Sequence, residues 1–266
     1  MAQFFGFLSA VFIGVTLGLI GGGGSILTVP SMVYLVGVDP VPATAYSLFV
    51  VGLTALVGSA MYMRRGLVSY RTALVFGIPS LTAVFLTRRF LMPAIPVHLG
   101  SISGIDISRD LGIMLLFALL MVAASTSMIR RGRPEVETDG IRYNYPAILT
   151  QGLVVGTLSG LVGAGGGFLI IPALAILARL PMKLAVGTSL LIIATQSLIG
   201  FTGDLGRMEV HWGFLAVFSA FAVGGILVGS WLTRFIPGAK LKPAFGWFTL
   251  AMGVYIIGRE LTQISM

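Results

Sequence analysis

The sequence predicts an all-α, polytopic integral membrane protein made of two inverted repeats of five segments each, with paired glycine-rich helix breaks. Three observations predict this fold class: an apolar composition, a duplicated glycine-rich pattern and an uneven distribution of basic residues. Of the 266 residues, 56% are hydrophobic and 10% are charged, and the mean hydropathy is +1.00. A soluble globular protein carries about 25% charged residues. The chain is therefore expected to lie in a lipid bilayer.

Apolar segments separated by glycine, proline and polar residues are expected to be helices, because membrane strands would be shorter and would alternate in polarity. The predicted segments cover residues 4–20, 25–37, 43–62, 69–90, 111–129, 146–162, 167–178, 184–203, 211–233 and 243–258. As helices, 25–37 and 167–178 would be only about 20 Å long, against a hydrocarbon core of about 30 Å. We interpret these two short segments as half-helices that begin at glycine-rich breaks.

The two glycine-rich breaks are Gly21–Ser25 and Gly163–Gly167, and both lie within apolar sequence. Glycine loses more backbone freedom on ordering than any other residue, so a run of glycines interrupts a helix. Inside a membrane, opened backbone is tolerated only where protein or a water-filled cavity satisfies its N–H and C=O groups. A pair of such breaks, one in each half of the chain, indicates the substrate site of a transporter.

The second half of the chain repeats the first at an offset of 142 residues, without a gap from Gly14/Gly156 to Val75/Val217. The matching positions include Gly21/Gly163, Gly23/Gly165, Gly24/Gly166, Pro30/Pro172, Ala43/Ala185, Ser47/Ser189 and Gly58/Gly200. We interpret this register as an internal duplication. The predicted first repeat covers residues 1–129, a polar cytoplasmic linker covers 130–145, and the second, inverted repeat covers 146–266.

An odd number of segments in each half reverses the orientation of the second half. If each segment crosses the bilayer, most basic residues fall on one side: Arg64, Arg65, Arg71, Arg130, Arg131, Arg133, Arg142, Arg179, Lys183, Arg234, Lys240 and Lys242. The other side receives Arg88, Arg89, Arg109, Arg207 and Arg259. The positive-inside rule then places the basic loops in the cytoplasm and both termini outside. Inverted repeats with broken helices predict a secondary transporter or channel of the cytoplasmic (inner) membrane.

The breaks are predicted to bind a small anion. A half-helix that begins at a break directs unpaired backbone N–H groups and a partial positive charge toward it, and both suit an anion. The predicted backbone donors are Gly21, Gly22, Gly23, Gly24 and Ser25, together with Gly163, Gly165, Gly166 and Gly167. Inverted breaks approach from opposite sides and can converge near the midplane. The alternative is that the glycines only allow close helix packing, as small residues do in membranes.

Hydroxyl and amide side chains near the breaks are further candidates for substrate binding. Ser47 and Ser189 occupy matching positions at the start of the following helices, with Thr188 and Thr44 as lesser candidates, and their hydroxyls can donate to an oxyanion. The alternative is local hydrogen bonding of these hydroxyls to helix carbonyls, or N-capping. Gln196 is the most polar residue within a segment, and it either contacts substrate or joins two helices by a hydrogen bond.

Several function classes are disfavoured by what the sequence lacks. No Asp or Glu lies deep inside a predicted segment, whereas cation transporters and proton pumps place carboxylates there. No Ser–His–Asp set and no HExxH motif is present, so the protein is not expected to be an enzyme. There is no cysteine, and His98 and His211 are interpreted as interfacial residues, so no metal or cofactor is expected. The net charge of +8 is read as a topology signal, without a nucleic-acid-binding motif.

The doubled break with its downstream serine resembles a known family. The stretch from Gly18 to Ser25, followed by Pro30 and by Ala43 to Ser47, and duplicated after a polar linker, is similar to the sulfite exporter TauE/SafE family of membrane permeases. The resemblance implies transport of a sulfur-containing anion, namely sulfite, thiosulfate or an organosulfonate. Export of such an anion needs no coupling carboxylate, because an inside-negative potential drives a monoanion outward by about 2.3 kcal/mol per 100 mV.

The sequence thus predicts a membrane exporter of a small sulfur-containing anion that works by alternating access, with the lipid bilayer and a small anionic substrate as its partners. Two other readings stay open. One is a transporter or channel for a different small solute, such as an amino acid, a carboxylate or a cation. The other is a membrane scaffold or receptor that transports nothing, which a packed midplane without a cavity between the breaks would favour.

Overall fold

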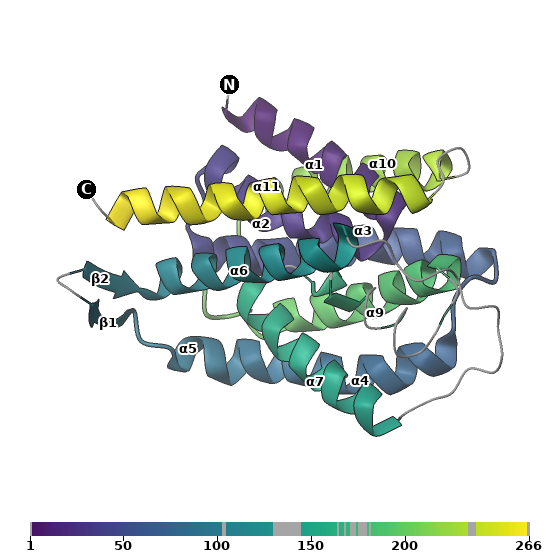
Figure 1. Cartoon of the computed structure of the whole chain (residues 1–266), viewed down its shortest axis with the longest axis horizontal. Coiled ribbons are helices and arrows are strands. Elements are labelled where there is room, and N and C mark those ends of the chain that lie inside the picture. The colour runs from purple at the N-terminus through teal and green to yellow at the C-terminus, as the bar shows by residue number, and fades with distance from the viewer. Residues whose placement is uncertain are drawn as a thin grey trace.

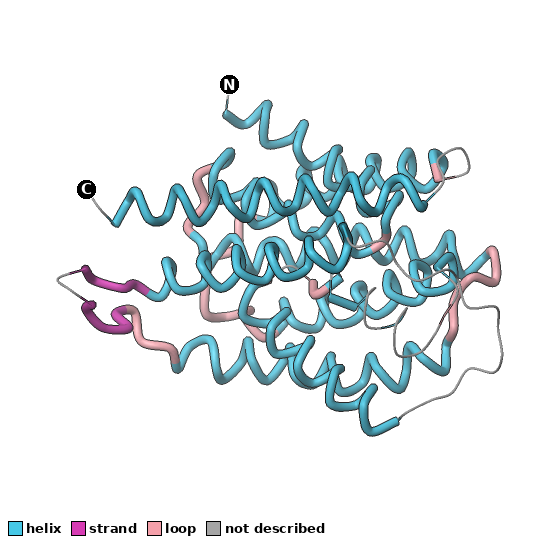
Figure 2. The backbone as a smooth tube through the Cα atoms, in the orientation of Figure 1, coloured by secondary structure: helices cyan, strands magenta, loops and turns pink. Residues whose placement is uncertain are grey.

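The computed structural model describes residues 2–102, 105–129, 145–163, 182–233 and 238–264, together with 165–167, 169, 170, 174 and 180. The described chain is helical apart from one short hairpin, so the all-α expectation is confirmed (Figures 1 and 2). Five of its helices are long and apolar enough to cross a membrane, namely Pro40–Arg64, Tyr70–Ala94, Arg109–Thr126, Lys183–Thr202 and Trp212–Leu232. The protein is therefore an integral membrane protein.

The first half of the chain contains helices at all five segments that the sequence predicts, and the second of these is short and broken. Its elements are α1 (Ala2–Ile20), the 3₁₀ turn η1 (Gly22–Leu27), α2 (Thr28–Ser31), the π-turn η2 (Met32–Val36), α3 (Pro40–Arg64), α4 (Tyr70–Leu86), the π-turn η3 (Thr87–Leu91), α5 (Met92–Ala94) and α6 (Arg109–Ile129). Two expectations were wrong. The short helix begins at Gly22 rather than at Ser25, and the helix predicted to end at residue 90 continues to Ala94.

A two-stranded antiparallel hairpin lies in the connection between the predicted segments 69–90 and 111–129. Its strands are β1 (His98–Ile102) and β2 (Ile105–Ser108), and Ile102 pairs with Ile105. Local backbone pairing satisfies the polar groups of a connection that would otherwise be irregular. The hairpin lies at one end of the molecule, beside the C-terminus (Figures 1 and 2).

The second half contains α7 (Tyr145–Val162), α9 (Met182–Thr202), α10 (Trp212–Leu232) and α11 (Gly238–Ile264). The predicted linker 130–145 and most of the predicted half-helix 167–178 lie outside the described residues. Large apolar side chains are exposed on the outer helices, including Leu74 and Ile78 of α4, Val228 of α10 and Trp247 of α11. Exposed apolar side chains of this size face lipid in a membrane protein, while the buried core lies between the helices.

Four helix pairs build the bundle, and each contact has a counterpart in the other half. α1 packs along α10 and α4 along α7, while α3 packs along α9 and α6 along α11. A Cβ added at Gly14 would meet the carbonyl oxygen of Ala222, and a Cβ added at Gly156 would meet that of Ser80. Gly156 lies 142 residues after Gly14, and Ala222 lies 142 residues after Ser80, so the two contacts are equivalent. The reciprocal contacts support the duplication that the sequence predicts.

Small residues set the closest of these helix approaches, as they do in many membrane proteins. Gly58 of α3 packs on Ile226 of α10, and its counterpart Gly200 of α9 packs on Val84 of α4. α6 and α11 run in opposite directions: α6 begins beside the hairpin, and α11 ends at that same end of the molecule (Figure 1).

Candidate functional site

The two glycine-rich breaks leave helical geometry at equivalent residues. Gly21 and Gly163 both have φ of 75°, a left-handed conformation that residues with a Cβ rarely adopt. Gly21 separates α1 from η1, and Gly163 directly follows α7. The helical turns then resume at Gly22, so in the first half the opening of the backbone is confined to a single residue. Glycine is required at both positions by the backbone itself.

The breaks converge inside the protein. The backbones of Gly22 and Gly167 lie against each other, so a Cβ added at either residue would overlap the backbone of the other. Gly21, Gly22 and Gly24 in the first break, and Gly163, Gly165, Gly166 and Gly167 in the second, are all buried. Protein rather than lipid therefore surrounds the opened backbone, as a broken helix in hydrocarbon requires.

The second break is lined by α3 from the first half and by α7 and α9 from the second. Gly163 packs on the backbone of Thr44, and the added Cβ of Gly165 would lie 2.7 Å from Ser197 Oγ and 2.9 Å from Val51 Cγ1. Gly166 lies against Ser159 of α7. Both halves of the chain thus build this region, although the residues are far apart in sequence.

Gln196 joins the second break to α4. Its Oε1 accepts a hydrogen bond of 2.5 Å from Ser80 Oγ, and its Nε2 donates to the carbonyl oxygen of Gly165. The amide is fully buried. This arrangement corresponds to the helix-joining alternative, because both ends of the amide are held by protein, and a role for Gln196 in substrate binding stays a prediction.

The predicted hydroxyl donors are arranged differently from one another. Ser189 Oγ donates to Val186 O at 2.8 Å, and Ser25 Oγ donates to Gly22 O at 2.7 Å. Thr188 Oγ1 accepts a hydrogen bond of 2.9 Å from Ser69 N. The hydroxyls of Ser189 and Thr188 thus make the local or structural contacts of the alternative reading. Ser25, which the sequence predicts as a backbone donor, also bonds locally through its side chain. Ser47 Oγ is buried and has no hydrogen-bond partner within the described residues.

Ser47 faces the second break together with two other unpartnered hydroxyls. It lies three residues after Thr44 and four before Val51, so it shares the helix face that contacts Gly163 and Gly165. Among the residues that the structure describes, Ser159 Oγ and Ser197 Oγ beside this break also lack hydrogen-bond partners. Buried hydroxyls are normally hydrogen-bonded. Three buried hydroxyls around one break can therefore still form hydrogen bonds with a ligand.

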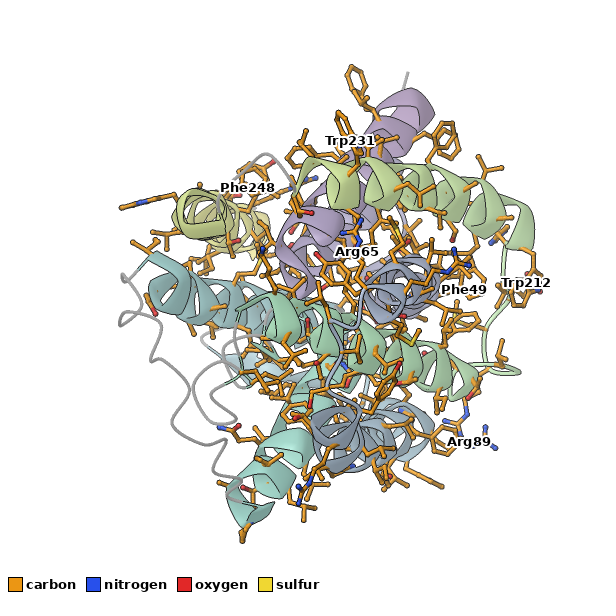
Figure 3. All side chains as sticks on the ribbon, turned by 90° about the vertical axis from the view of Figure 1, so that its right-hand side faces the viewer. Phe49, Arg65, Arg89, Trp212, Trp231 and Phe248 are labelled. Carbon is orange, nitrogen blue, oxygen red and sulfur yellow. The ribbon has the colours of Figure 1, made fainter. Side chains whose placement is uncertain are left out.

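Arg88 is the residue of this region that the sequence did not single out. It lies in η3 and is 0% exposed, and it is the largest fully buried side chain in the described part of the chain. Its Nη1 donates to Thr44 Oγ1 at 3.0 Å and lies 3.4 Å from Asp204 Oδ2. The sequence placed both Arg88 and Arg89 on the outer side of the membrane. In the structure Arg88 is buried, whereas Arg89 is exposed and points away from the bundle (Figure 3).

Asp204 is the acidic partner of Arg88, and it lies just beyond the end of α9. Burial raises the pKa of the Asp204 carboxyl above its usual value, while the nearby charges of Arg88 and Arg207 act to lower it. Its side chain is 13% exposed, so the ion pair has one fully buried member and one member close to the protein surface. Within the described residues, no group of three His, Cys, Asp or Glu side chains is placed to hold a metal ion.

A bundle of membrane-length helices around two buried, converging helix breaks is typical of membrane transporters. Comparison with known protein families places the chain within that class: residues 6–256 match the family described as "Sulfite exporter TauE/SafE". The protein belongs to this family and is a membrane transporter.

Individual relatives agree with this assignment. A "Probable membrane transporter protein" of Xylella fastidiosa is 33% identical over 267 residues, which cover 95% of this chain and 94% of the relative. The "Probable membrane transporter protein YunE" of Bacillus subtilis is 30% identical over 215 residues, covering 73% of this chain and 75% of the relative. "Probable membrane transporter protein MJ0441" of Methanocaldococcus jannaschii is 35% identical over 123 residues, covering 42% of this chain and 44% of the relative.

Proposed function

We propose that the protein exports a small sulfur-containing anion, such as sulfite, thiosulfate or an organosulfonate, by alternating access across the cytoplasmic membrane. The observation that carries the proposal is the meeting of Gly22 and Gly167, which brings the two broken helices together in the buried interior. The hydroxyls of Ser47, Ser159 and Ser197 have no hydrogen-bond partner among the described residues, and such donors suit a guest rich in oxygen. Backbone N–H groups at the start of a helix suit an anion as well.

The proposed orientation has two inverted repeats, both termini outside and the basic loops in the cytoplasm. The antiparallel directions of α6 and α11 and the reciprocal contacts of Gly14 and Gly156 support an inverted relation between the halves. In such folds one repeat moves against the other around a fixed site near the midplane. The contact between Gly22 and Gly167 must open during this cycle for the amides of the breaks to reach an anion.

The direction of transport follows from the charge of the substrate. A monoanion gains about 2.3 kcal/mol per 100 mV when it leaves a cell with an inside-negative potential. Export of such an anion is therefore favourable without a second ion that moves with it. The carboxylate of Asp204 is paired with Arg88, and this route requires no proton-carrying acid.

The test is transport by the purified protein in proteoliposomes with an imposed potassium diffusion potential. Vesicles loaded with radiolabelled sulfite should lose it faster when the interior is negative, and unlabelled thiosulfate and sulfoacetate should compete. Empty vesicles are the control. A flux restricted to amino acids or cations would favour transport of a different solute, and the absence of any solute flux would favour the scaffold reading.

A further inference from the structure

Arg88 is a buried cation with an incomplete set of partners. The guanidinium group has five N–H donors in a planar fork and remains charged in proteins. Among the described residues, only Nη1 has polar partners, namely Thr44 Oγ1 at 3.0 Å and Asp204 Oδ2 at 3.4 Å. Nε and Nη2 are buried and have no hydrogen-bond partner among the described residues. A buried polar group without a partner is costly, so the free edge of Arg88 calls for an explanation.

The free edge has the geometry that oxyanions require. The Nε and Nη2 groups lie side by side along one edge of the guanidinium plane, where two parallel N–H donors match two oxygens of one anion. Asp204 does not occupy this edge, because its carboxylate approaches Nη1 alone. The ion pair thus balances the charge of Arg88 and leaves its bidentate edge available.

Arg88 is also connected to the glycine break. Thr44, which accepts its hydrogen bond, is the residue whose backbone packs on Gly163. Ser47, with its unpartnered hydroxyl, lies one turn further along the same face of α3. A cation, a hydroxyl and the start of a broken helix therefore lie together along α3.

We propose that Arg88 is a substrate-binding residue whose Nε–Nη2 edge binds two oxygens of the transported oxyanion, with Asp204 as its resident counter-ion. The proposal rests on the anion transport proposed above and deepens it: the substrate class becomes anions with two oxygens on one centre, such as sulfite and sulfonates. An anion at this edge would share the charge of Arg88 with Asp204, so Asp204 competes with the substrate.

The charged pair joins the two halves, because Arg88 lies in the first and Asp204 in the second, and the repeat does not produce a second copy of it. The residues 142 positions from Arg88 and Asp204 are Ser230 and Tyr62, neither of which is charged at neutral pH. The two halves, whose helix contacts are otherwise equivalent, therefore differ at the Arg88–Asp204 pair. In the proposed orientation, the cation lies on the outward side of the second break.

A purely structural role is the alternative, in which Arg88 ties α4 to α3 and to the segment after α9. The variant R88K separates the two roles, because lysine keeps the charge for Asp204 but lacks the bidentate edge. R89K is the matched control, since Arg89 is the adjacent residue and is exposed. The double variant R88Q/D204N removes both charges together and leaves no unpaired carboxylate.

The experiment measures sulfite efflux from proteoliposomes and the thermal stabilisation of detergent-solubilised protein by sulfite. We expect R88K to raise the KM for sulfite about tenfold or more with little loss of thermal stability, and R89K to match the wild type. D204N should lower the KM, because it removes the competing carboxylate. R88Q/D204N should fold, as judged by its elution as a single species, but should lose stabilisation by sulfite.

An unchanged KM in R88K would overturn the assignment of Arg88 while leaving sulfite transport in place. If wild-type protein neither transports nor binds sulfite, the same stabilisation assay is run with methanesulfonate and acetate. Stabilisation by methanesulfonate in the wild type but not in R88K would support Arg88 as a site for an organosulfonate. Stabilisation by acetate alone, lost in R88K, would support Arg88 as an anion site and reject the sulfur substrate. No stabilisation by any of them would overturn both proposals.

Discussion

Gly22 and Gly167 lie backbone to backbone, although the first belongs to the first half of the chain and the second to the second half. Each is a residue that the sequence predicts at a helix break, and neither has room for a Cβ. The contact therefore ties the conformation of one break to that of the other. Any movement that exposes the amides of the first break must also displace the second.

The first prediction concerns this contact. Gly22→Val should abolish transport, because the added side chain would force apart two backbones that meet in the interior, and overpacking of this kind costs about 1–3 kcal/mol. Solute efflux from proteoliposomes and the melting temperature are the measurements. Gly224→Ala is the control, since a Cβ added there meets nothing within 4 Å. Transport at the wild-type rate by Gly22→Val would argue against a site at the breaks.

The second prediction concerns Gln196, which holds both Ser80 and the carbonyl oxygen of Gly165. Gln196→Leu should lower the free energy of unfolding by about 1–3 kcal/mol, because it leaves both buried partners unsatisfied. Thr195→Val is a suitable control, since Thr195 is exposed and bonds only to its own helix. Unfolding in a series of detergent mixtures measures the difference. Equal stability of the two variants would mean that the amide contributes nothing to the fold.

The third prediction tests the equivalence of the halves. Gly14→Ala and Gly156→Ala should destabilise the protein to a similar extent, because each added methyl group would meet a carbonyl oxygen of the neighbouring helix. The cost expected for each is about 1–3 kcal/mol. Thermal unfolding of both variants beside Gly213→Ala, which adds a Cβ in open space, provides the comparison. A large cost at one glycine alone would contradict equivalent packing.

The fourth prediction tests the proposed orientation. The natural chain has no cysteine, so single cysteines can be introduced without a background signal. In intact cells, a membrane-impermeant maleimide should label Arg207→Cys, which lies in an exposed turn after α9, but not Thr138→Cys in the polar linker. Permeabilised cells should show labelling of both. The reverse pattern would place the basic loops outside.

The repeat is predicted from the sequence because glycine and proline mark positions that overall composition does not. Gly58 and Gly200 were aligned from sequence alone, and in the structure they contact the equivalent residues Ile226 and Val84. Helix packing in a membrane depends on small residues at close approaches, so their spacing in the sequence records the packing directly. Turns and breaks interrupt the apolar runs, which is why most of the described helices lie where the sequence predicts segments, although several of their ends differ by a few residues.

The burial of Arg88 could not be predicted, because two adjacent arginines at the end of an apolar segment look like an interfacial anchor. Successive residues on a helix point in directions about 100° apart, so only one of the pair can face the bundle. An outer helix with apolar residues on all sides gives no periodicity to show which one does. The hairpin was missed for a related reason, since its strands are too short to give a pattern.

A transporter whose halves were identical would exchange the roles of those halves between its two end states, and the two states would have equal free energy. Arg88 of the first half pairs with Asp204 of the second, whereas the equivalent residues Ser230 and Tyr62 are uncharged, so the two end states would differ in free energy. Under the alternating access proposed above, the protein would have a preferred resting state in the absence of solute, and a bound anion would change that preference by altering the balance of a single ion pair.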